Sequence, residues 1–300
     1  MNPRCLIDGE EAVFLLKKDG YDEYICPKCS LSFVHPQPKA EWLRDEVYSL
    51  ESGYQRNKVV DLSKEKESKR YGRPLDYMAK HKPNGLFLDV GCSSGQVMYW
   101  ANKRGLNPSG VEINKRTADM ARENGFPVFN GFLKDSNFSK NSFDTAFLGD
   151  VIEHVNNPRE FIGEVKSFIK PDGLVVISTP NVNCFWSKTT LWLYRIFNIP
   201  WTSATPPYHL FQFSYENLNI LMNEFDFKPE KVFYLPPPSL MYEIGSLHLY
   251  KEYKNNKTIK NWLYMMFAFG LYTVVYGLNW IKFVFIKKDF QMTVVYSLNK

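Results

Sequence analysis

Leu86-Phe-Leu-Asp-Val-Gly-Cys-Ser-Ser-Gly-Gln96 is the stretch that decides the fold of this 300-residue chain. It begins with a short apolar run, which indicates a buried strand, and ends in a glycine-rich turn that opens a helix. Gly91 and Gly95 lack a Cβ, so the backbone can turn tightly there and a ligand can lie against it. Because doubly wound α/β sheets bind nucleotides at such strand-to-helix turns, the stretch predicts a ligand site at the carboxyl end of a strand.

Strands and helices alternate after this turn. The apolar strand patterns and the helical patterns follow one another at 108–113, 114–124, 127–130, 143–148, 158–169 and 174–178. Strands separated by helices of this length form βαβ units, so we expect an α/β fold with a parallel sheet and helices on both faces.

The pattern divides the chain into five segments. The charged run 61–70 is expected to be the solvated face of a helix within the second segment. The segments are a ribbon-like unit at 1–38, a helical linker and cap at 39–84, a core at 85–235 with a lid insertion at 182–208, an apolar insertion at 236–290, and a last core strand at 291–300.

Composition and charge restrict the class of partner. The formal net charge is +5, which permits an anionic membrane surface or a phosphorylated substrate and is too weak to indicate nucleic acid. Aromatic residues make up 16% of the chain, which indicates that some aromatic surface meets a ligand, a partner or lipid. The first residues contain no apolar run before the first acids, so we expect no signal peptide and a cytoplasmic location.

Two carboxylates are placed to hold a nucleoside. Asp89 ends the first strand, where it can order the loop or meet a cationic group, and Glu112 ends the next strand, where it can accept from vicinal ribose hydroxyls. Both acids also fit a dinucleotide fold, whose loop has the pattern G-x-G-x-x-G. Gly91-Cys-Ser-Ser-Gly95 lacks the third glycine, so a nucleotide-dependent oxidoreductase remains only as an alternative.

Asp89-Val-Gly-Cys-Ser-Ser-Gly95 resembles motif I of class I S-adenosylmethionine-dependent methyltransferases, D/E-x-G-C-G-x-G, with Ser93 in place of the middle glycine. Three later stretches resemble the branch that contains ubiquinone-pathway O-methyltransferases and sugar methyltransferases: Gly149-Asp-Val-Ile-Glu-His-Val155, Ile177-Ser-Thr-Pro-Asn181 and His209-Leu-Phe-Gln-Phe-Ser214. The resemblance covers roughly 60–235 and the last strand, and it implies a Rossmann-like, seven-stranded, mostly parallel sheet.

The resemblance also implies a cofactor, S-adenosylmethionine, and the residues that bind it. It assigns Asp89, Gly91, Cys92, Ser93 and Gly95 to the methionine part, Glu112 with Ile113 to the ribose, Gly131 and Phe132 to the adenine, and Gly149 and Asp150 to the methionine side. A non-enzymatic binding module with a degenerate methyltransferase core is a further alternative, although the intact loop and Glu112 argue against it.

Two histidines are the candidate catalytic residues. A sulfonium methyl donor is already activated, so the protein must hold a nucleophile in line with the methyl group. A hydroxyl nucleophile must also lose a proton, which a base promotes. His154 follows the fourth strand and His209 closes the lid insertion, and we expect at least one of them to be that base. The alternative for each is a structural role, as a hydrogen-bonded loop residue or as an anchor for the lid.

The N-terminal cysteines predict a metal site. Cys26-Pro-Lys-Cys29 is one knuckle of a zinc ribbon, and the partner knuckle, Cys5-Leu-Ile-Asp8, has an aspartate that can ligate zinc through oxygen. The expected zinc ligands are Cys5, Asp8, Cys26 and Cys29, with His35 as a spare. Sugar methyltransferases of the resembled group often begin with such a ribbon and a turn like Phe33-Val-His-Pro-Gln-Pro38. A ribbon that has lost its metal is the alternative.

The segment 262–281 is 20 residues long without a charge, and it lies between lysines. That length can cross a bilayer, but the last core strand must return to the domain, which favours a helix in the membrane interface. Burial against the domain or a second subunit, and a true span, are the alternatives. We therefore expect a small-molecule, sugar, glycan or lipid-linked acceptor, peripheral membrane contact through 262–286, and no nucleic acid; a homodimer remains open.

Overall fold

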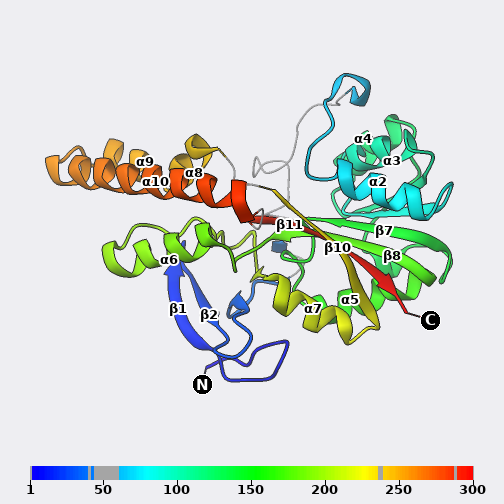
Figure 1. Cartoon of the computed structure of the whole chain (residues 1–300), viewed down its shortest axis with the longest axis horizontal. Coiled ribbons are helices and arrows are strands. Elements are labelled where there is room, and N and C mark those ends of the chain that lie inside the picture. The colour runs from blue at the N-terminus through cyan, green and yellow to red at the C-terminus, as the bar shows by residue number, and fades with distance from the viewer. Residues whose placement is uncertain (1, 40–41, 44–60, 236–238, 287–288, 300) are drawn as a thin grey trace. The chain divides into compact units, whose positions relative to one another are not determined.

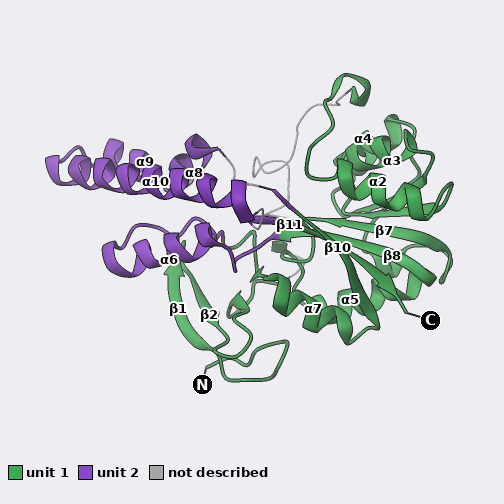
Figure 2. Cartoon of the chain, viewed as in Figure 1, with its two compact units in different colours: residues 1–179, 206–233, 293–300 green, residues 180–205, 234–292 purple. Residues whose placement is uncertain are grey.

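The computed structural model describes residues 2–39, 42–43, 61–235, 239–286 and 289–299. The chain forms two compact units, each made from separate stretches of sequence (Figure 2). The first unit contains 1–179, 206–233 and 293–300, and the second contains 180–205 and 234–292. The lid insertion and the apolar insertion, which were expected as separate segments, therefore contribute to one unit.

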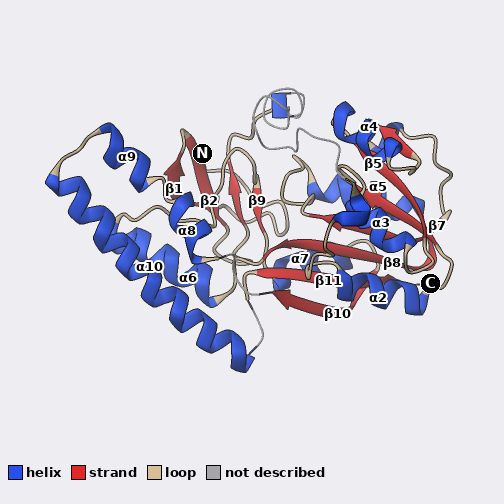
Figure 3. Ribbon diagram, turned by 90° about the horizontal axis from the view of Figure 1, so that it is seen from above, coloured by secondary structure: helices blue, strands red, loops and turns tan. Residues whose placement is uncertain are grey.

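The first unit is built on a seven-stranded sheet. Figures 1 and 3 show β7, β8, β10 and β11 of this sheet lying side by side. Parallel ladders join β4 to β5, β4 to β7, β5 to β6 and β7 to β8. In spatial order the strands are β10 (Phe227–Leu235), β11 (Gln291–Leu298), β8 (Ile169–Pro180), β7 (Phe143–Gly149), β4 (Leu86–Val90), β5 (Asn107–Glu112) and β6 (Val128–Asn130). This Rossmann-like α/β architecture confirms the predicted fold class.

Helices cover both faces of this sheet (Figure 1). One face carries α2 (Gly72–His81), α3 (Gln96–Asn102) and α4 (Lys115–Glu123), and the other carries α5 (Pro158–Phe168) and α7 (Tyr215–Asn223). The local sequence fixes where these helices begin. Asn114 caps α4 by accepting from the amides of Arg116 and Thr117, and Asn157 caps α5 with Pro158 in its first turn.

The helix expected across the second segment is shorter than the sequence pattern indicated. Residues 72–81 form α2, and of the charged run only Leu62–Lys64 forms a single 3₁₀ turn. Residues 44–60 lie outside the described part of the chain. The charged run is also not simply a solvated face, since Arg70 pairs with Asp150 beside the cavity described below.

The N-terminal residues form a four-stranded antiparallel sheet. Its order is β1 (Val13–Lys18), β2 (Tyr21–Ile25), β3 (Ser32–Val34) and β9 (Phe211–Gln212). The fourth strand comes from far along the chain, through pairing of Ser32 with Gln212 and Phe33 with Phe211. The ribbon-like segment thus belongs to the same compact unit as the α/β sheet.

The second unit consists of helices around an apolar core. These are α6 (Phe185–Phe197), α8 (Leu240–Ser246), α9 (Leu249–Asn255) and the long α10 (Ile259–Ile286). Trp186 and Tyr272 are fully buried, with ring centroids 5.5 Å apart. The helix α10 is long and apolar enough to cross a membrane by length and composition.

Candidate active site

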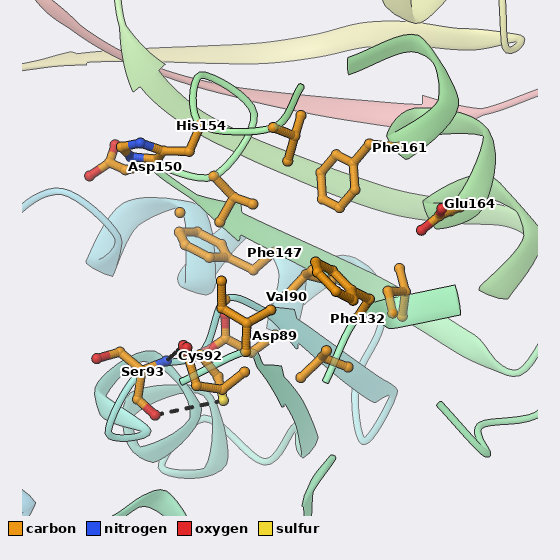
Figure 4. Close-up of a pocket in the computed structure, with 18 of the residues that line it drawn as sticks. Asp89, Val90, Cys92, Ser93, Phe132, Phe147, Asp150, His154, Phe161 and Glu164 are labelled. Carbon is orange, nitrogen blue, oxygen red and sulfur yellow. Dashed lines mark hydrogen bonds between the residues drawn. The ribbon is translucent and has the colours of Figure 1, made fainter. Parts of the chain in front are cut away.

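A cavity of about 600 Å³ opens in the first unit at the carboxyl ends of β4, β5 and β7 (Figure 4). In the sheet, β4 lies between β5 and β7, so the chain leaves β4 toward one side of the sheet and later returns to its other side. Ligands of open α/β sheets bind at such a switch point. Figure 4 shows Asp150 and His154 together at one end of the cavity and Phe132 and Phe161 in another part of its wall.

The loop after β4 is shaped by backbone conformations that favour glycine. Gly91 has φ +76°, and a Cβ there would lie 2.7 Å from the Cγ2 of Val151. The amides of Gly91 and Cys92 both donate to the carbonyl of Val111, at 2.8 and 3.1 Å. The loop is thus tied to β5, and Gly91 is needed there because Val151 fills the place that a Cβ would take.

Glu112 connects the two neighbouring turns of the sheet. Its Oε2 accepts from the amide of Ser93 at 2.8 Å, and its Oε1 accepts from the amide of Asn114 at 2.7 Å. Burial raises the pKa of this carboxyl, and hydrogen bonds from the backbone oppose the rise. A carboxylate has about four lone-pair positions, so Glu112 can hold the loop and still accept from a diol in the cavity.

Asp89 lies beneath the loop with an unsatisfied oxygen. The side chain is 2% exposed, and its Oδ2 has no hydrogen-bonding partner among the described residues. Burial, followed by the charge of Glu112, raises the pKa of Asp89 to about 8. Because a buried polar oxygen without a partner is costly, the site is suited to a cationic group that would pair with it.

The remaining predicted cofactor residues lie on the far walls. Gly131 has φ +150°, and its amide donates to the carbonyl of Glu112 at 3.1 Å, which turns Phe132 toward the cavity. Asp150 also has a positive φ, +54°, and forms an ion pair with Arg70. These contacts fix the turns after β6 and β7.

Of the residues predicted to bind the cofactor, Gly95 alone does not line the cavity. It starts α3 with φ +88° and packs toward Phe126 and Ala121. Cys92 lines the cavity, but its sulfur packs into the core, since a Cβ on Gly110 would lie 2.6 Å from it. The predicted cofactor residues that line the cavity are Asp89, Gly91, Cys92, Ser93, Glu112, Ile113, Gly131, Phe132, Gly149 and Asp150.

Sequence reasoning missed several residues of the wall. Tyr71 and Gln96 line the cavity and are joined by a hydrogen bond of 2.6 Å from the tyrosine hydroxyl to the Oε1 of Gln96. Phe161 and Glu164 come from α5. The α5 residues could have been predicted, because a helix that follows the fourth strand of such a sheet faces the glycine loop. The sequence around Tyr71 contains no pattern that indicates a position at the site.

His154 and His209 lie side by side. Their rings make an edge-to-face contact with centroids 4.9 Å apart, and His154 lines the cavity. The segment around His209 is held because the amides of Leu210 and Phe211 both donate to the carbonyl of Glu153, at 2.7 and 3.2 Å. Burial lowers the pKa of His154 to about 4 and lowers that of His209 as well.

The tautomer of His154 follows from its partner. Its Nδ1 lies 2.5 Å from the carbonyl oxygen of Tyr208, which can only accept. The Nδ1 therefore carries the hydrogen, and Nε2 carries the lone pair. Glu153, His154 and His209 also offer ligand atoms within 4.8 Å of one another, which is close enough for a shared cation.

The N-terminal cluster brings the four predicted metal ligands together. One ligand atom each from Cys5, Asp8, Cys26 and Cys29 lies within 4.8 Å of all the others. The sulfurs of Cys5 and Cys29 are 3.5 Å apart, too far for a disulfide and close to the roughly 3.8 Å that tetrahedral zinc–sulfur bonds impose. Backbone amides of Ile7 and Cys29 point at the sulfurs of Cys5 and Cys26, both at 3.4 Å. This donor set fits zinc.

Comparisons with known proteins agree with this geometry. The methyltransferase domain family matches residues 63–232. A ubiquinone biosynthesis O-methyltransferase of Actinobacillus pleuropneumoniae serotype 7 is 33% identical over 36% of this chain and 52% of its own length. The Rickettsia conorii protein with the same description is 34% identical over 53% of this chain and 58% of its own length. The chain thus spans about half the length of the curated relatives it matches.

Solved structures with a related chain path include an S-adenosylmethionine-dependent methyltransferase from Archaeoglobus fulgidus, 17% identical, with a TM-score of 0.47 over 76% of this chain and 91% of the other. A possible histamine N-methyltransferase from Thermotoga maritima has the same identity and a TM-score of 0.46, over 76% of this chain and 89% of its own. The family match extends over more than half of the residues. The chain belongs to the methyltransferase domain family.

Proposed function

We propose that this chain transfers a methyl group from S-adenosylmethionine to a hydroxyl of a small-molecule acceptor. The observation that carries the proposal is the pair of buried carboxylates, Asp89 and Glu112, at the edge of one cavity. The two acids suit the ammonium group and the ribose of this donor, and the loop from Gly91 to Gly95 lacks the third glycine that a dinucleotide-binding turn has.

The residues present fit the cofactor. The unpartnered oxygen of Asp89 suits the ammonium of its methionine part, and Glu112 suits its ribose hydroxyls. The loop at Gly91 and Ser93 lines the cavity, and Phe132 offers an aromatic ring to the adenine. When bound, the cofactor supplies a methyl group already activated by a positive sulfur.

The protein's own contribution is to position the acceptor and take its proton. His154 is neutral at pH 7 because burial lowers its pKa to about 4, so it does not have to lose a proton before it acts. Its Nε2, which carries the lone pair, would hold the proton that the acceptor hydroxyl gives up. The cofactor would supply the methyl group, and its sulfur would leave with the electrons of the broken S–C bond as S-adenosylhomocysteine. His209, which packs edge-on against His154, is assigned a positioning role.

The acceptor class is supported by two kinds of observation. The relatives are described as O-methyltransferases of ubiquinone biosynthesis, which favours a phenolic or isoprenoid acceptor. The N-terminal ribbon resembles that of sugar methyltransferases, which favours a sugar or glycan, and a lipid-linked saccharide would satisfy both. We further propose a cytoplasmic location for the reaction.

Binding and turnover test the function separately. Calorimetry should show S-adenosylhomocysteine binding to the purified chain at one site, and labelled methyl transfer should appear with sugar nucleotides, lipid-linked glycans or quinone precursors. Absence of any binding by S-adenosylhomocysteine contradicts the donor assignment. Binding without transfer to any of these acceptors contradicts the acceptor class and leaves the donor site intact.

We also propose that Cys5, Asp8, Cys26 and Cys29 hold a structural zinc ion. Elemental analysis should give about one zinc per chain, because structural sites of this kind are closed and bind tightly. Cys26→Ser should lose the metal, while Cys184→Ser should keep it, since Cys184 lies outside the cluster. Far less than one zinc in the unaltered protein would identify the cluster as a ribbon without metal.

A further inference from the structure

The helix α10 of the second unit has two apolar faces. One stripe packs inside the unit, and a second, on the opposite side of the helix, faces outward. The inward stripe is Met265, Ala268, Tyr272, Val275 and Asn279. The outward stripe is Leu263, Phe267, Gly270, Val274, Leu278, Ile281 and Phe285, whose large side chains are between 46% and 81% exposed. Both stripes follow the 3.6-residue period, so the outward one runs the length of the helix.

This outward stripe is not what a helix at the surface of a water-soluble protein shows. Such helices place charged and polar residues opposite the buried face. From Ile259 to Ile286 the sequence contains no acidic residue, and its two lysines stand near the ends, at 260 and 282. The helix is about 42 Å long at 1.5 Å per residue, so the exposed apolar strip is long and continuous, and such strips mark interaction surfaces.

Charge separates the possible partners of this strip. The second unit contains nine lysines and arginines and three aspartates and glutamates, a formal net charge of +6, which exceeds the +5 of the whole chain. Two of its three acids, Glu243 and Asp289, are buried. Lys251, Lys254 and Lys257 are exposed on and after α9, directly before α10. A second copy of the same basic surface would repel it, whereas an anionic surface attracts it.

We propose that the outward face of α10 lies in the interface of an anionic lipid bilayer. The outward side chains enter the boundary between headgroups and acyl chains, and the lysines of α9 and of the start of α10 meet the headgroups. Trp262 and Trp280, about 40% exposed and near opposite ends of α10, are the residue type that favours this depth.

The contacts of α10 argue for lying in the interface over crossing the bilayer. Polar contacts hold α10 within the unit along its length. The hydroxyl of Tyr264 donates to the carbonyl of Asn198 at 2.8 Å and that of Tyr272 to the carbonyl of Pro200 at 3.0 Å. The side-chain amide of Asn279 donates to the carboxylate of Asp289 at 2.8 Å. The helix also packs against α9, whose surface is charged. A spanning α10 would draw these groups into hydrocarbon, at a large cost.

Vesicle flotation of the full chain tests the proposal. We expect binding to vesicles of phosphatidylcholine with phosphatidylglycerol, and much weaker binding to phosphatidylcholine alone. Neutralising Lys254, Lys257 and Lys260 to glutamine should weaken binding to the anionic vesicles on the order of a hundredfold at low salt, since each lysine near the surface is worth about fivefold. The matched control neutralises Lys66, Lys69 and Lys228, which are exposed in the first unit, and should bind as the unaltered chain does.

Two substitutions test the apolar face. Leu263→Glu and Leu278→Glu place a charge on the outward stripe, where both leucines are at least 50% exposed, so the fold should be kept. Binding to vesicles should be lost, while binding of S-adenosylhomocysteine and the melting temperature stay unchanged. Ile220→Glu, on the exposed face of α7 in the first unit, is the control and should leave vesicle binding intact.

Three results would overturn the proposal. The first is no binding of the full chain to anionic vesicles, or equal binding by Leu263→Glu. The second is a dimer in sedimentation that Leu263→Glu dissociates while vesicles have no effect, which would assign the face to a second copy. The third is resistance of the bound protein to alkaline carbonate extraction, which would show a spanning helix. None of these depends on methyl transfer, so failure here is distinguishable from failure of the proposed function.

Discussion

The carboxylate of Glu112 accepts a hydrogen bond of 2.8 Å from the backbone amide of Ser93, so the acid that ends β5 also fixes the loop that ends β4. Its other oxygen accepts from the amide of Asn114 at 2.7 Å. The loop after β4 is therefore held in place by Glu112, the same residue that is proposed to bind the ribose. A change at Glu112 should disturb the loop as well as the hydroxyl contacts.

Glu112→Gln tests this double role. The amide keeps one acceptor oxygen and places an NH₂ against one of the two backbone donors, so one hydrogen bond is replaced by a repulsive contact. We expect the affinity for S-adenosylhomocysteine to fall about 30-fold or more, because hydrogen bonds to a charged group are worth about 1.5–3 kcal/mol. Calorimetry measures the loss. Glu123→Gln, at an exposed position in α4, is the control and should bind normally; normal binding by Glu112→Gln would contradict the role.

The raised pKa of Asp89 leads us to expect that its carboxyl releases a proton when the cofactor binds. Its pKa is raised to about 8 by burial and by Glu112, so in the free protein it is largely protonated at pH 7. A bound ammonium stabilises the ionised form and lowers this pKa, which expels the proton. Calorimetry at pH 7 in buffers of different ionisation enthalpy should show between half and one proton released. Affinity should rise as pH increases from 6 to 8.

Asp89→Asn cannot ionise and supplies the control for that effect. Its affinity should be weaker than that of the unaltered chain by roughly tenfold to a hundredfold at pH 8 and should not change between pH 6 and 8. Equal pH dependence in the two proteins would assign the proton to another group.

The sequence was sufficient for the alternation of strands and helices and, to within one residue, for the carboxyl ends of β4 to β7, although β8 begins at Ile169, five residues before the predicted strand. The apolar runs and the glycine loop follow from local periodicity, and position at a strand end places Asp89 and Glu112 together because parallel strands share an edge. Which backbone amides Glu112 would accept from was not predictable, since that depends on the exact course of two loops. The ion pair of Arg70 with Asp150 joins residues 80 apart, and a charged run gives no indication of which member turns inward.

The sequence also did not predict which apolar segments pack against one another. The lid segment 182–208 and the apolar segment 236–290 contribute to one core, in which Trp186 meets Tyr272. Each segment has more than one apolar face, and hydrophobic periodicity does not specify which face meets which. The strand Phe211–Gln212 was missed for a related reason, because two residues are too few to show a period.

The role of His154 predicts a particular pH profile. A base must be neutral to accept a proton, and the pKa of His154 is about 4, so turnover should be level from about pH 5 to 7 and fall as pH decreases through 4. His154→Gln should reduce kcat by about 10²–10⁴-fold and leave S-adenosylhomocysteine affinity unchanged. His209→Gln should have a smaller effect on kcat and shift the acid limb, because removing its ring changes the surroundings of His154. His81→Gln, at an exposed position, is the control.

Treatment with a chelator distinguishes the role of His154 as a base from its role as a ligand of a metal ion. Since Glu153, His154 and His209 are also spaced for a metal ion, a metal-dependent reaction would lose activity with a chelator and recover it with added divalent cation. The base assignment predicts no loss at chelator concentrations that leave any metal of the N-terminal cluster in place, as checked by elemental analysis. Chelator-sensitive turnover with zinc retained would replace the base by a cation site.

Replacing the buried Glu23 should stabilise the folded protein by an amount that depends on pH. It is fully buried in β2, its Oε2 has no hydrogen-bonding partner among the described residues, and burial raises its pKa to about 8 from an ordinary value of 4.5. The folded state therefore keeps a proton that the unfolded state loses, so stability falls as pH rises from about 4.5 to 8. Glu23→Gln removes this term and should raise the free energy of unfolding on the order of 2–4 kcal/mol at pH 8 and by little near pH 4. Denaturant titration at the two pH values measures the difference, with Glu123→Gln as the exposed control, and a gain of equal size at both would show that ionisation of Glu23 is not its cause.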